Sequence, residues 1–253
     1  MRGGCRIAGR GDGRGGGVDV ILEVCVDTSA GLDEAVAGGA DRIELCAALA
    51  LGGLTPSAGF MAEAARCGLP VMAMIRLRAG DFVFSEVELV QMEKDIAAAR
   101  TAGLAGVVLG ASLPDGRLDL PALRRLRAAA GEMDCTLHRT FDLVPDQAEA
   151  LEQALHLRFS RILTSGGERT AEAGAERIAA LLAQAKGRIS IMPGSGITAA
   201  NAPRFLAMGA TELHASCSVP APATGRAVDL GFAPAAGKRT DAAAVKALRQ
   251  ALR

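Results

Sequence analysis

Apolar and polar positions alternate in short stretches along the chain, and each stretch is followed by signals of a helix. In residues 41–47, apolar Ile43 and Leu45 fall on one side and polar residues fall on the other. This period of two predicts a short strand. After a glycine pair, Ser57 is placed to cap a helix over residues 58–66. A strand, a glycine loop and a capped helix make half of a βαβ unit.

The same succession of signals recurs along the whole chain. Strands are predicted over residues 18–26, 41–46, 70–77, 105–110, 135–140, 161–164, 189–192 and 211–215. Helices are predicted over residues 28–37, 58–66, 85–102, 120–130, 146–157, 171–185, 198–208 and 241–252, and a loop over 218–239. Such alternation implies parallel strands, and no break in composition is long enough for a domain linker. The sequence therefore predicts a single-domain α/β fold, a closed (β/α)8 TIM barrel over residues 18–253, with an open doubly wound sheet as the alternative.

Composition and charge narrow the classes of function. The chain has 253 residues, of which 50% are hydrophobic, and its formal net charge is zero. There is no basic excess to attract nucleic acid or an anionic membrane, and an aromatic fraction of 3% offers few stacking surfaces for bases. No apolar run reaches the roughly 18 residues that a membrane span needs. We therefore expect no nucleic-acid partner, no membrane partner and no nucleotide cofactor.

The first residues and the cysteines bear on the compartment. Residues 1–17 are rich in glycine and arginine and lack the apolar stretch of about 7–15 residues that a secretory signal needs. They are predicted to be a disordered extension. The chain's 6 cysteines are scattered, with no CxxC pair. In a chain long enough for a large core, this pattern predicts reduced thiols in a cytoplasm.

Polar residues gather where the predicted strands end, and the loops after the strands build the site of a TIM barrel. These residues are Glu23, Cys25, Glu44, Cys46, Arg76, Arg78, His138, Arg139, Asp142, Thr164, Ser165, Gly194, Gly196, His214 and Ser216. Because isolated charges are costly to bury, we expect Glu44 and Arg76 to pair with each other. Alternatively, Glu23, Glu44 and Arg76 belong to an ion-pair network that merely fills the barrel.

The segment His138-Arg139-x-Phe141-Asp142 is the strongest candidate for catalysis. A histidine can transfer a proton near neutral pH, and a carboxylate can orient it. We therefore take His138 and Asp142 as candidate acid–base residues, with Glu44 as a further candidate catalytic carboxylate. Alternatively, Arg139 and Asp142 form a structural pair at the end of a strand.

Two arginines and a glycine loop are candidates for binding an anion. In Arg76-x-Arg78-x-x-Asp81, two guanidinium groups point to one region, which suits a bidentate grip on carboxylate or phosphate. Gly194 and Gly196 follow the seventh predicted strand and precede a helix, so their amides could cradle an anion, although a tight turn explains them nearly as well. The candidate anion-binding set also includes Arg139, Thr164, Ser165, His214 and Ser216.

Cys25 and Cys46 end neighbouring predicted strands with the same parity. Because adjacent strands lie about 4.8 Å apart, the two sulfurs could be close, and two soft thiolates could bind Cu(I). Zinc would need four ligands, and no further Cys or His lies at zinc spacing. The alternative is that both cysteines are small buried hydrophobic residues.

Several of these segments together resemble one protein family. They are Leu22-Glu-Val-Cys25, Gly39-Ala-Asp-Arg-Ile-Glu-Leu-Cys46, Gly52-Gly-Leu-Thr-Pro-Ser57, Ile75-Arg-Leu-Arg78, Gly80-Asp-Phe82, His138-Arg139, Phe141-Asp142, Ile162-Leu-Thr-Ser-Gly166, Glu212-Leu-His214 and Ser216. Spread over roughly residues 20 to 217, they resemble the CutC copper homeostasis proteins. The resemblance is far more specific than any single motif.

This resemblance implies a cytosolic TIM barrel that self-associates, as a dimer or tetramer, and is linked to copper tolerance or Cu(I) binding. Carried over to this chain, the proposed copper ligands of the family fall on Cys25 and Cys46. The chain departs from the family pattern at Leu77 and Ala79, which replace proline and glycine, and at Val26, where some members carry a second cysteine. The segment after Ser216 has no clear counterpart.

Two hypotheses follow. The first is a copper homeostasis protein that binds Cu(I) through Cys25 and Cys46. The second is a barrel enzyme that acts on a small anionic substrate, phosphorylated ones included, with His138 and Asp142 as acid–base groups and arginines as a clamp. Two thiols explain copper, but they do not explain the histidines, arginines and acids at the strand ends.

Overall fold

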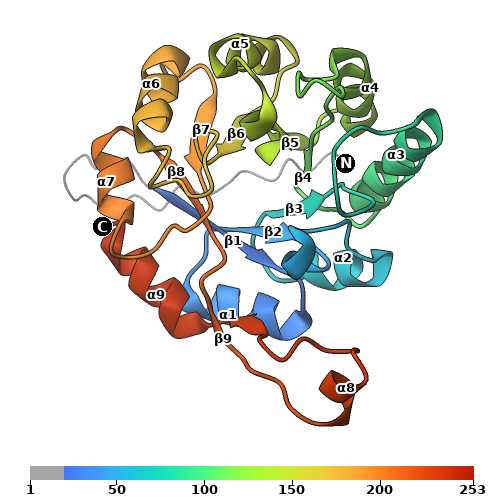
Figure 1. The fold of residues 1–253 in the computed structure, drawn as a ribbon, viewed down its shortest axis with the longest axis vertical. Coiled ribbons are helices and arrows are strands. Elements are labelled where there is room, and N and C mark those ends of the chain that lie inside the picture. Colours follow the sequence, from blue (N-terminus) through green and yellow to red (C-terminus); the bar gives the residue numbers. More distant parts are fainter. Residues whose placement is uncertain (1–19) are drawn as a thin grey trace, which may run out of the picture.

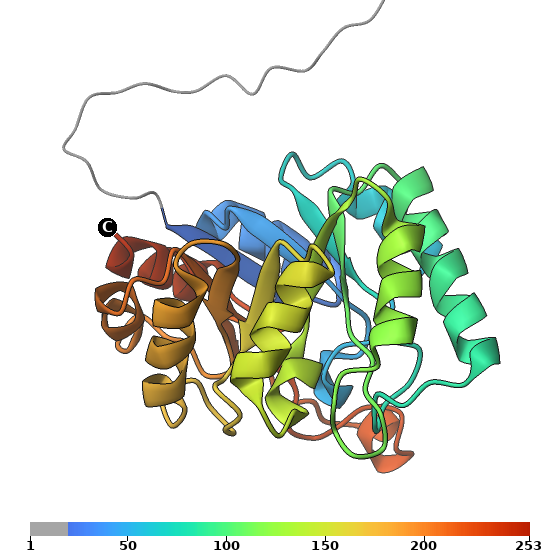
Figure 2. The same ribbon diagram turned by 90° about the horizontal axis from the view of Figure 1, so that it is seen from above.

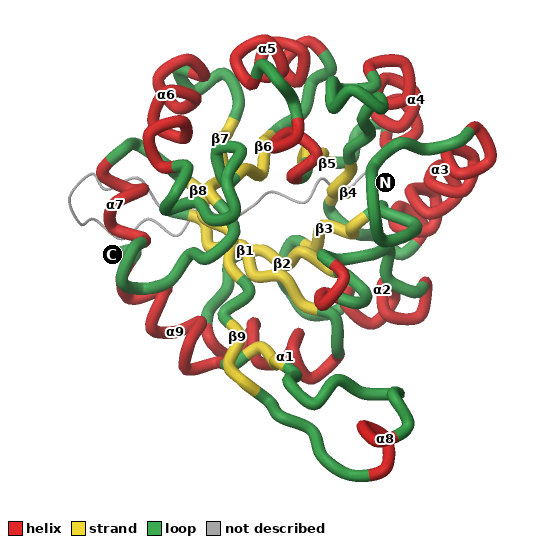
Figure 3. The backbone as a smooth tube through the Cα atoms, viewed as in Figure 1, coloured by secondary structure: helices red, strands yellow, loops and turns green. Residues whose placement is uncertain are grey.

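The computed structural model describes residues 20–253, and the expectation for residues 1–17 lies outside them. Eight strands lie at the centre and helices surround them (Figures 1 and 3). The strands are β1 (Ile21–Val26), β2 (Arg42–Leu45), β3 (Val71–Met74), β4 (Gly106–Leu109), β5 (Asp134–Leu137), β6 (Arg161–Thr164), β7 (Ser190–Pro193) and β8 (Glu212–Ala215). The main helices are α1 (Ser29–Gly38), α2 (Ala58–Ala64), α3 (Glu86–Thr101), α4 (Leu120–Ala130), α5 (Gln147–His156), α6 (Ala175–Ala185), α7 (Ala202–Ala207) and α9 (Ala242–Ala251).

The strands pair in parallel in the order β7-β6-β5-β4-β3-β2-β1-β8, so the first strand lies between the second and the eighth. Connections between successive parallel strands pass through the surrounding helices. The predicted (β/α)8 barrel is therefore confirmed, and the open doubly wound alternative is wrong. Among the described helices, none is both long and apolar enough to cross a membrane.

The barrel closes where β7 and β8 lie next to each other, although no ladder joins them within residues 20–253. The amides of Ser190 and Gly194 donate to carbonyls on the β6 side. Because alternate amides of a strand point in opposite directions, the nitrogen of Pro193 faces β8, and proline has no N–H to donate. Proline thus removes a donor from this seam.

Local signals set most of the helix ends. Thr28 accepts a hydrogen bond from the first turn of α1, and Gly39 ends this helix with φ of 90°, a conformation that favours glycine. Ser85 and Glu88 form the predicted capping box of α3. Ser57 caps α2 through its side chain, as predicted.

Three local predictions need correction. The fifth strand ends at Leu137 and not at residue 140, because the His138 side chain caps a short 3-10 helix, η2 (Arg139–Leu143). Thr198 does not cap a helix, since α7 begins only after Asn201. The predicted loop over 218–239 contains two short strands and a helical turn, β9 (Ser218–Pro220), α8 (Arg226–Asp229) and β10 (Lys238–Thr240). These elements form an arm on the side of the barrel where the strands end (Figure 2).

The two faces of each strand meet different surroundings. Leu22 and Val24 of β1 belong to the large apolar core between the barrel and the helices. Glu23 lies between them in sequence and therefore points into the barrel, where it is fully buried. The register places Arg42 of β2 and His214 of β8 beside Glu23. A polar layer therefore crosses the barrel interior at this level.

Two arginines hold this polar layer together. Arg42 donates to both Glu23 and Glu212. Arg161 donates to Glu212 at 3.0 Å and to Asp134 at 2.7 Å. The layer thus links β1, β2, β5, β6 and β8. We call its residues the ionic floor: Glu23, Arg42, Asp134, Arg161 and Glu212. The expectation of an ion-pair network inside the barrel is correct, but its cations are Arg42 and Arg161 and not Arg76.

We predict that Arg42→Ala lowers the free energy of unfolding by about 3–5 kcal/mol, because it leaves the carboxylates of Glu23 and Glu212 buried without their shared cation. Arg188→Ala, which removes an exposed ion pair with Glu152, is the matched control and should cost far less. Urea unfolding followed by far-ultraviolet circular dichroism measures both, since the chain has no Trp or Tyr. Equal losses in the two variants would contradict a structural role for the ionic floor.

Candidate functional site

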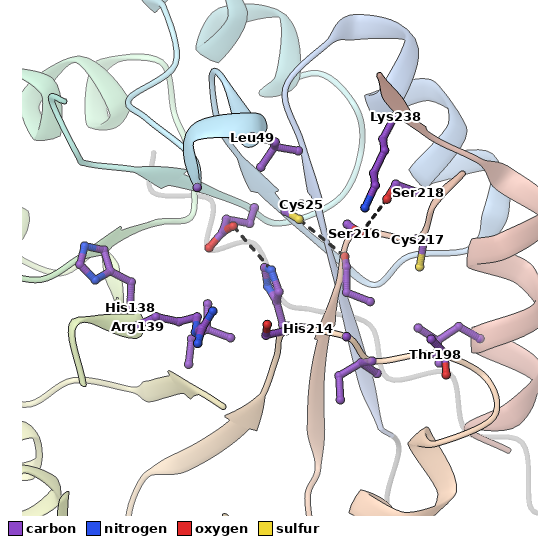
Figure 4. A pocket seen from close by; sticks show the side chains of 18 of the residues that line it. Cys25, Leu49, His138, Arg139, Thr198, His214, Ser216, Cys217, Ser218 and Lys238 are labelled. Atoms are coloured by element: carbon purple, nitrogen blue, oxygen red, sulfur yellow. Dashed lines mark hydrogen bonds and ion pairs between the residues drawn. The ribbon is translucent and has the colours of Figure 1, made fainter. Parts of the chain in front are cut away.

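A cavity of about 710 Å³ opens where the barrel strands end. It is lined by residues of β1, β2, β3, β6 and β8 and of the loops after β2, β3, β5, β7 and β8, together with residues of the β9–β10 arm and α9 (Figure 4). We call this cavity the mouth. The predicted site residues that line it are Cys25, Glu44, Arg76, His138, Arg139, Gly196, His214 and Ser216. Predicted site residues that do not line it are Cys46, Arg78, Asp81, Asp142, Thr164, Ser165 and Gly194.

Three potential metal ligands meet at the base of the mouth. The register of β1 and β2 places Cys25 directly beside Glu44, and His214 reaches the same point from β8. One ligand atom from each of these residues lies within 4.8 Å of the other two. The Oε1 atom of Glu44 is buried without a hydrogen-bond partner. Because buried polar atoms are nearly always satisfied, this oxygen marks a place where a bound cation would fit.

Glu23 orients the histidine of this group. Its Oε1 lies 2.9 Å from Nδ1 of His214, so Nε2 turns towards Glu44 at 3.7 Å. Burial alone would raise the pKa of Glu23, but Arg42 and His214 outweigh it and lower the pKa to about 2. Glu23 therefore stays ionised at neutral pH. A carboxylate on the far nitrogen is the usual support of a metal-binding histidine.

The ionised surroundings also change the acid–base behaviour of the ligands. Burial opposes the charged form of His214, but Glu44 and its other neighbours outweigh burial and raise the pKa of this imidazole well above its ordinary value. Burial is the main cause that raises the pKa of Glu44. Both groups therefore favour their protonated forms more than they would in water.

Cys46 lies beside this group but not in the mouth. Its thiol lies 3.5 Å from Oε2 of Glu44 and is fully buried. Met72, Met74 and Val108 pack around it in a small cluster inside the barrel. Burial raises the pKa of Cys46 well above its ordinary value. Both predicted copper cysteines therefore flank Glu44, with Cys25 at the cavity and Cys46 behind it.

Arg76 does not pair with Glu44, so that expectation is wrong. Its guanidinium donates to the carbonyls of Leu51 at 2.9 Å, Gly53 at 3.2 Å and Gly80 at 3.0 Å. The loop after β2 wraps around the end of β3 and supplies the first two of these carbonyls, which hold the side chain away from Glu44. No carboxylate within residues 20–253 forms an ion pair with Arg76.

Arg78 and Arg76 do not point to one region. Arg78 donates to Glu88 at 2.6 Å and to Asp81 at 2.9 Å, and its side chain is 40% exposed. The capping carboxylate of α3 therefore draws Arg78 outwards. The predicted two-arginine clamp is not assembled, and Arg76 alone of this pair lines the mouth.

Asp142 is occupied by the loop after β6. Its carboxylate accepts hydrogen bonds from Thr164, from Ser165 and from the amide of Gly167. It also pairs with Arg139 at 2.7 Å. This geometry agrees with the alternative that Arg139 and Asp142 form a structural pair. In the described part of the chain, no hydrogen bond joins Asp142 to His138. An acid–base role for Asp142 stays a prediction without this contact.

His138 is turned into the mouth with one nitrogen unused. Its Nδ1 accepts the amide of Thr140 at 3.2 Å, which assigns the ring proton to Nε2. Nε2 is buried and has no partner. Burial and the charge of Arg76 lower the pKa of His138 to about 3. At neutral pH this residue is an uncharged donor rather than a proton carrier.

The glycine loop after β7 serves packing. The amide of Gly194 donates to Thr164 at 2.9 Å, and a side chain at this position would lie 2.5 Å from Leu163 and 3.3 Å from Cβ of His214. Glycine therefore allows β7 and β8 to approach. The helix α7 that follows has only 6 residues and begins at Ala202. The expected cradle at a helix N-terminus is not formed.

Some residues of the mouth had not been selected from the sequence. Lys238 comes from the arm that was predicted to be a loop, and Phe82 had served only as part of the family resemblance. Figure 4 shows Lys238 on the opposite side of the mouth from His138 and Arg139, with Cys25 and His214 between them. The sequence had indicated a possible ion-pair network that includes Glu23, but nothing local indicated that Glu23 supports His214.

Comparison with known proteins places the chain among close relatives. Residues 20–219 match the model of the CutC family. A family protein CutC of Sinorhizobium medicae (strain WSM419) is 57% identical over 235 residues, which cover 92% of this chain and 96% of the relative. Another, from Caulobacter vibrioides (strain NA1000 / CB15N), is 50% identical over 238 residues, covering 92% of this chain and 97% of the relative.

Solved structures of similar fold include a member of the same family. CutC of Streptococcus agalactiae, a protein named for copper homeostasis, superposes with a TM-score of 0.75 at 33% identity, covering 78% of this chain and 98% of that one. Thiamine phosphate pyrophosphorylase of Pyrococcus furiosus superposes with a TM-score of 0.57 at 15% identity, covering 93% of this chain and 96% of that one. The second likeness shows the fold alone.

We predict that His138 makes the protein less stable in acid. Its pKa lies near 3 in the folded chain and near the ordinary 6.5 in the unfolded chain, so acid protonates the unfolded state first. Between these values the free energy of unfolding should fall by up to about 1.4 kcal/mol per pH unit as pH falls, and this contribution is absent above pH 6.5. Urea unfolding of wild type and His138→Gln across this range measures it. Parallel pH dependence in the two proteins would contradict the buried, uncharged imidazole.

Proposed function

The chain belongs to the CutC family, and from this membership we propose that it binds Cu(I) at the base of the mouth, with Cys25 and Cys46 as thiol ligands. The observation that carries the proposal is the meeting of Cys25, Glu44 and His214 within 4.8 Å, with Cys46 in contact with Glu44. Copper here is the cargo of a homeostasis protein.

The residues fit this ion chemically. Cu(I) prefers soft sulfur ligands and accepts imidazole, and both are present. The five cysteines within residues 20–253 are free thiols, so neither Cys25 nor Cys46 is consumed by a disulfide. His214 is the nearest nitrogen ligand, and Glu23 holds it in place through Nδ1. The unpartnered oxygen of Glu44 supports a positive charge at this position.

The proposed compartment and oligomeric state rest on the free thiols and on the family resemblance. We place it in the cytoplasm, where a reducing environment keeps thiols free. We also propose a homo-oligomer, a dimer or a tetramer, as the family resemblance implies. Light scattering coupled to size-exclusion chromatography measures the oligomer, and a monomer at micromolar concentration would contradict it.

A second candidate function is an enzyme that acts on a small anionic substrate. The observation that favours it is the basic character of the mouth, where Arg76 is buried without a carboxylate and Arg139 and Lys238 also line the cavity. A barrel that only fills its interior would use apolar side chains there at lower cost. His138 and Arg76 are the residues on which turnover would depend, and Asp142 and Glu44 remain candidate carboxylates.

We predict that wild-type protein binds one Cu(I) per chain under reducing conditions and that Cys25→Ser/Cys46→Ser loses it. Competition with a chromophoric Cu(I) chelator measures the affinity, which should fall by at least about tenfold because two sulfur ligands are replaced by harder oxygens. Cys135→Ser is the matched control, since Cys135 is buried on the outer face of β5 in the apolar core. Unchanged affinity in the double variant, or an equal loss in Cys135→Ser, would contradict the site.

The enzyme candidate is tested separately. Wild-type protein is incubated with a panel of small carboxylates and sugar phosphates, and proton NMR follows the appearance of products. Turnover that disappears in His138→Ala and Arg76→Ala, while circular dichroism shows both variants folded, would support the enzyme. Turnover that survives in both variants would exclude these residues as its basis.

A further inference from the structure

We propose that Arg76 and His138 form a binding site for the carboxylate group of a small organic acid, on the wall of the mouth away from the Cys25–Glu44–His214 group. The inference deepens the second candidate function above by naming the class of its ligand. It does not depend on copper. Two buried donors without acceptors and one buried positive charge without a partner support it.

Arg76 carries the uncompensated charge. The residue is only 6% exposed, yet it makes hydrogen bonds to backbone carbonyls alone. Its Nε is buried with no partner. Buried charges in proteins are normally paired with an opposite charge, because desolvation is costly. The three carbonyls fix the guanidinium in place, so the residue is held ready rather than free to reach solvent.

His138 adds a second donor beside it. The ring is 3% exposed, its Nδ1 is engaged by the amide of Thr140, and its Nε2–H has no acceptor. Arg76 and His138 both contact the ring of Phe82, so the two groups share one neighbour on the wall of the mouth. An oxygen acceptor between them would satisfy both donors at once.

The backbone is shaped to bring this ring forward. A side chain on Gly110 would lie 2.4 Å from Cε1 of His138, so only glycine at the end of β4 lets the imidazole lie across that strand. β4 is the strand between those that carry Arg76 and His138. The absence of a side chain at Gly110 therefore allows the two donors to face a common region.

Phe82 covers the pair. Its ring lies 4.9 Å from the Arg76 guanidinium carbon and 4.9 Å from the centre of the His138 ring. Both unused nitrogens are covered in this structure, and Phe82 is half-buried on the loop after β3. A ligand would reach the donors by turning Phe82 aside. The ring of Phe82 thus shields the charge of Arg76 from solvent, and a bound ligand would take the place of the ring.

The charges of the mouth favour a monoanion. On this wall Arg76 supplies one unpaired positive charge, whereas Arg139 is already paired with Asp142 and Lys238 lies on the opposite side of the mouth. The carboxyl group of Glu44 lies at the base of the same cavity and offers no positive charge to balance a doubly charged phosphate. A carboxylate carries one charge and two oxygens, which matches one cation and two N–H donors.

The test is an NMR titration of the full chain with acetate, with its neutral analogue acetamide and with inorganic phosphate. The Nε–H signal of Arg76 and the Nε2–H signal of His138 report binding directly, without any need for turnover. We expect both signals to shift with acetate, and acetamide to bind at least about tenfold more weakly because it lacks the charge. Arg76→Gln should weaken acetate by about tenfold or more.

Matched variants show whether acetate binds at this wall or elsewhere on the protein. Arg78→Gln removes the same charge two residues away, outside the mouth, and should change acetate affinity by less than about twofold. Phe82→Ala should bind acetate at least as well as wild type, since it uncovers the donors. Cys25→Ser/Cys46→Ser should bind acetate normally, so loss of copper binding and loss of the carboxylate site are told apart.

Several results would overturn the inference. These are unmoved Arg76 and His138 signals at saturating acetate, equal binding of acetamide, or an equal loss in Arg78→Gln. Binding of phosphate without binding of acetate would also overturn it. Should Arg76→Gln fail to fold, His138→Ala and the wild-type signals decide the question. Acetate binding without turnover of any carboxylate would leave the site standing and remove the enzyme candidate.

Discussion

The structure depends on the ionic floor, in which Arg42 and Arg161 are shared among Glu23, Glu212 and Asp134 inside the barrel. Apolar residues would fill this interior at lower desolvation cost. We therefore look for the role of the ionic floor in the residues that it holds in place. Glu23 is both a member of the floor and the support of His214. The contact of Glu23 with Nδ1 leaves Nε2 of His214 turned towards Glu44, so the ionic floor and the group at the base of the mouth share this residue.

Above the floor, the mouth is divided by charge. At its base, Cys25, Glu44 and His214 leave an oxygen of Glu44 without a donor, which suits a cation. On its wall, Arg76 and His138 leave donors without an acceptor, which suits an anion. The same physical rule, that buried polar atoms are satisfied, identifies both places and assigns them opposite ligands. The proposed Cu(I) binding would satisfy the first place, and the proposed carboxylate ligand would satisfy the second.

Much of the fold could be predicted from local sequence. The capping box at Ser85, the cap at Thr28 and the left-handed Gly39 act within one helical turn, so their effects are visible in the sequence itself. Alternation in β2 placed Glu44 and Cys46 on the inner face. Residues 218–239 were misjudged as loop, because a short antiparallel pair of strands depends on a partner that lies some 20 residues away. His138 was misjudged as part of a strand because its side chain, and not its backbone pattern, ends β5.

The sequence by itself determined the alternation of strands and helices, the shared face of Glu44 and Cys46 and the end of the strands at which polar residues gather, because these follow from periodicity and from helix signals. Only the tertiary structure decided the partners. Arg76 and Glu44 had the charges of a pair, yet backbone carbonyls of the loop after β2 hold Arg76 away. Cys25 lies close to His214, which is far away in the sequence, only because β8 pairs with β1 in the closed barrel. Ion pairs and ligand sets depend on distances of a few ångströms between remote segments, and such distances leave no periodic signal in the chain.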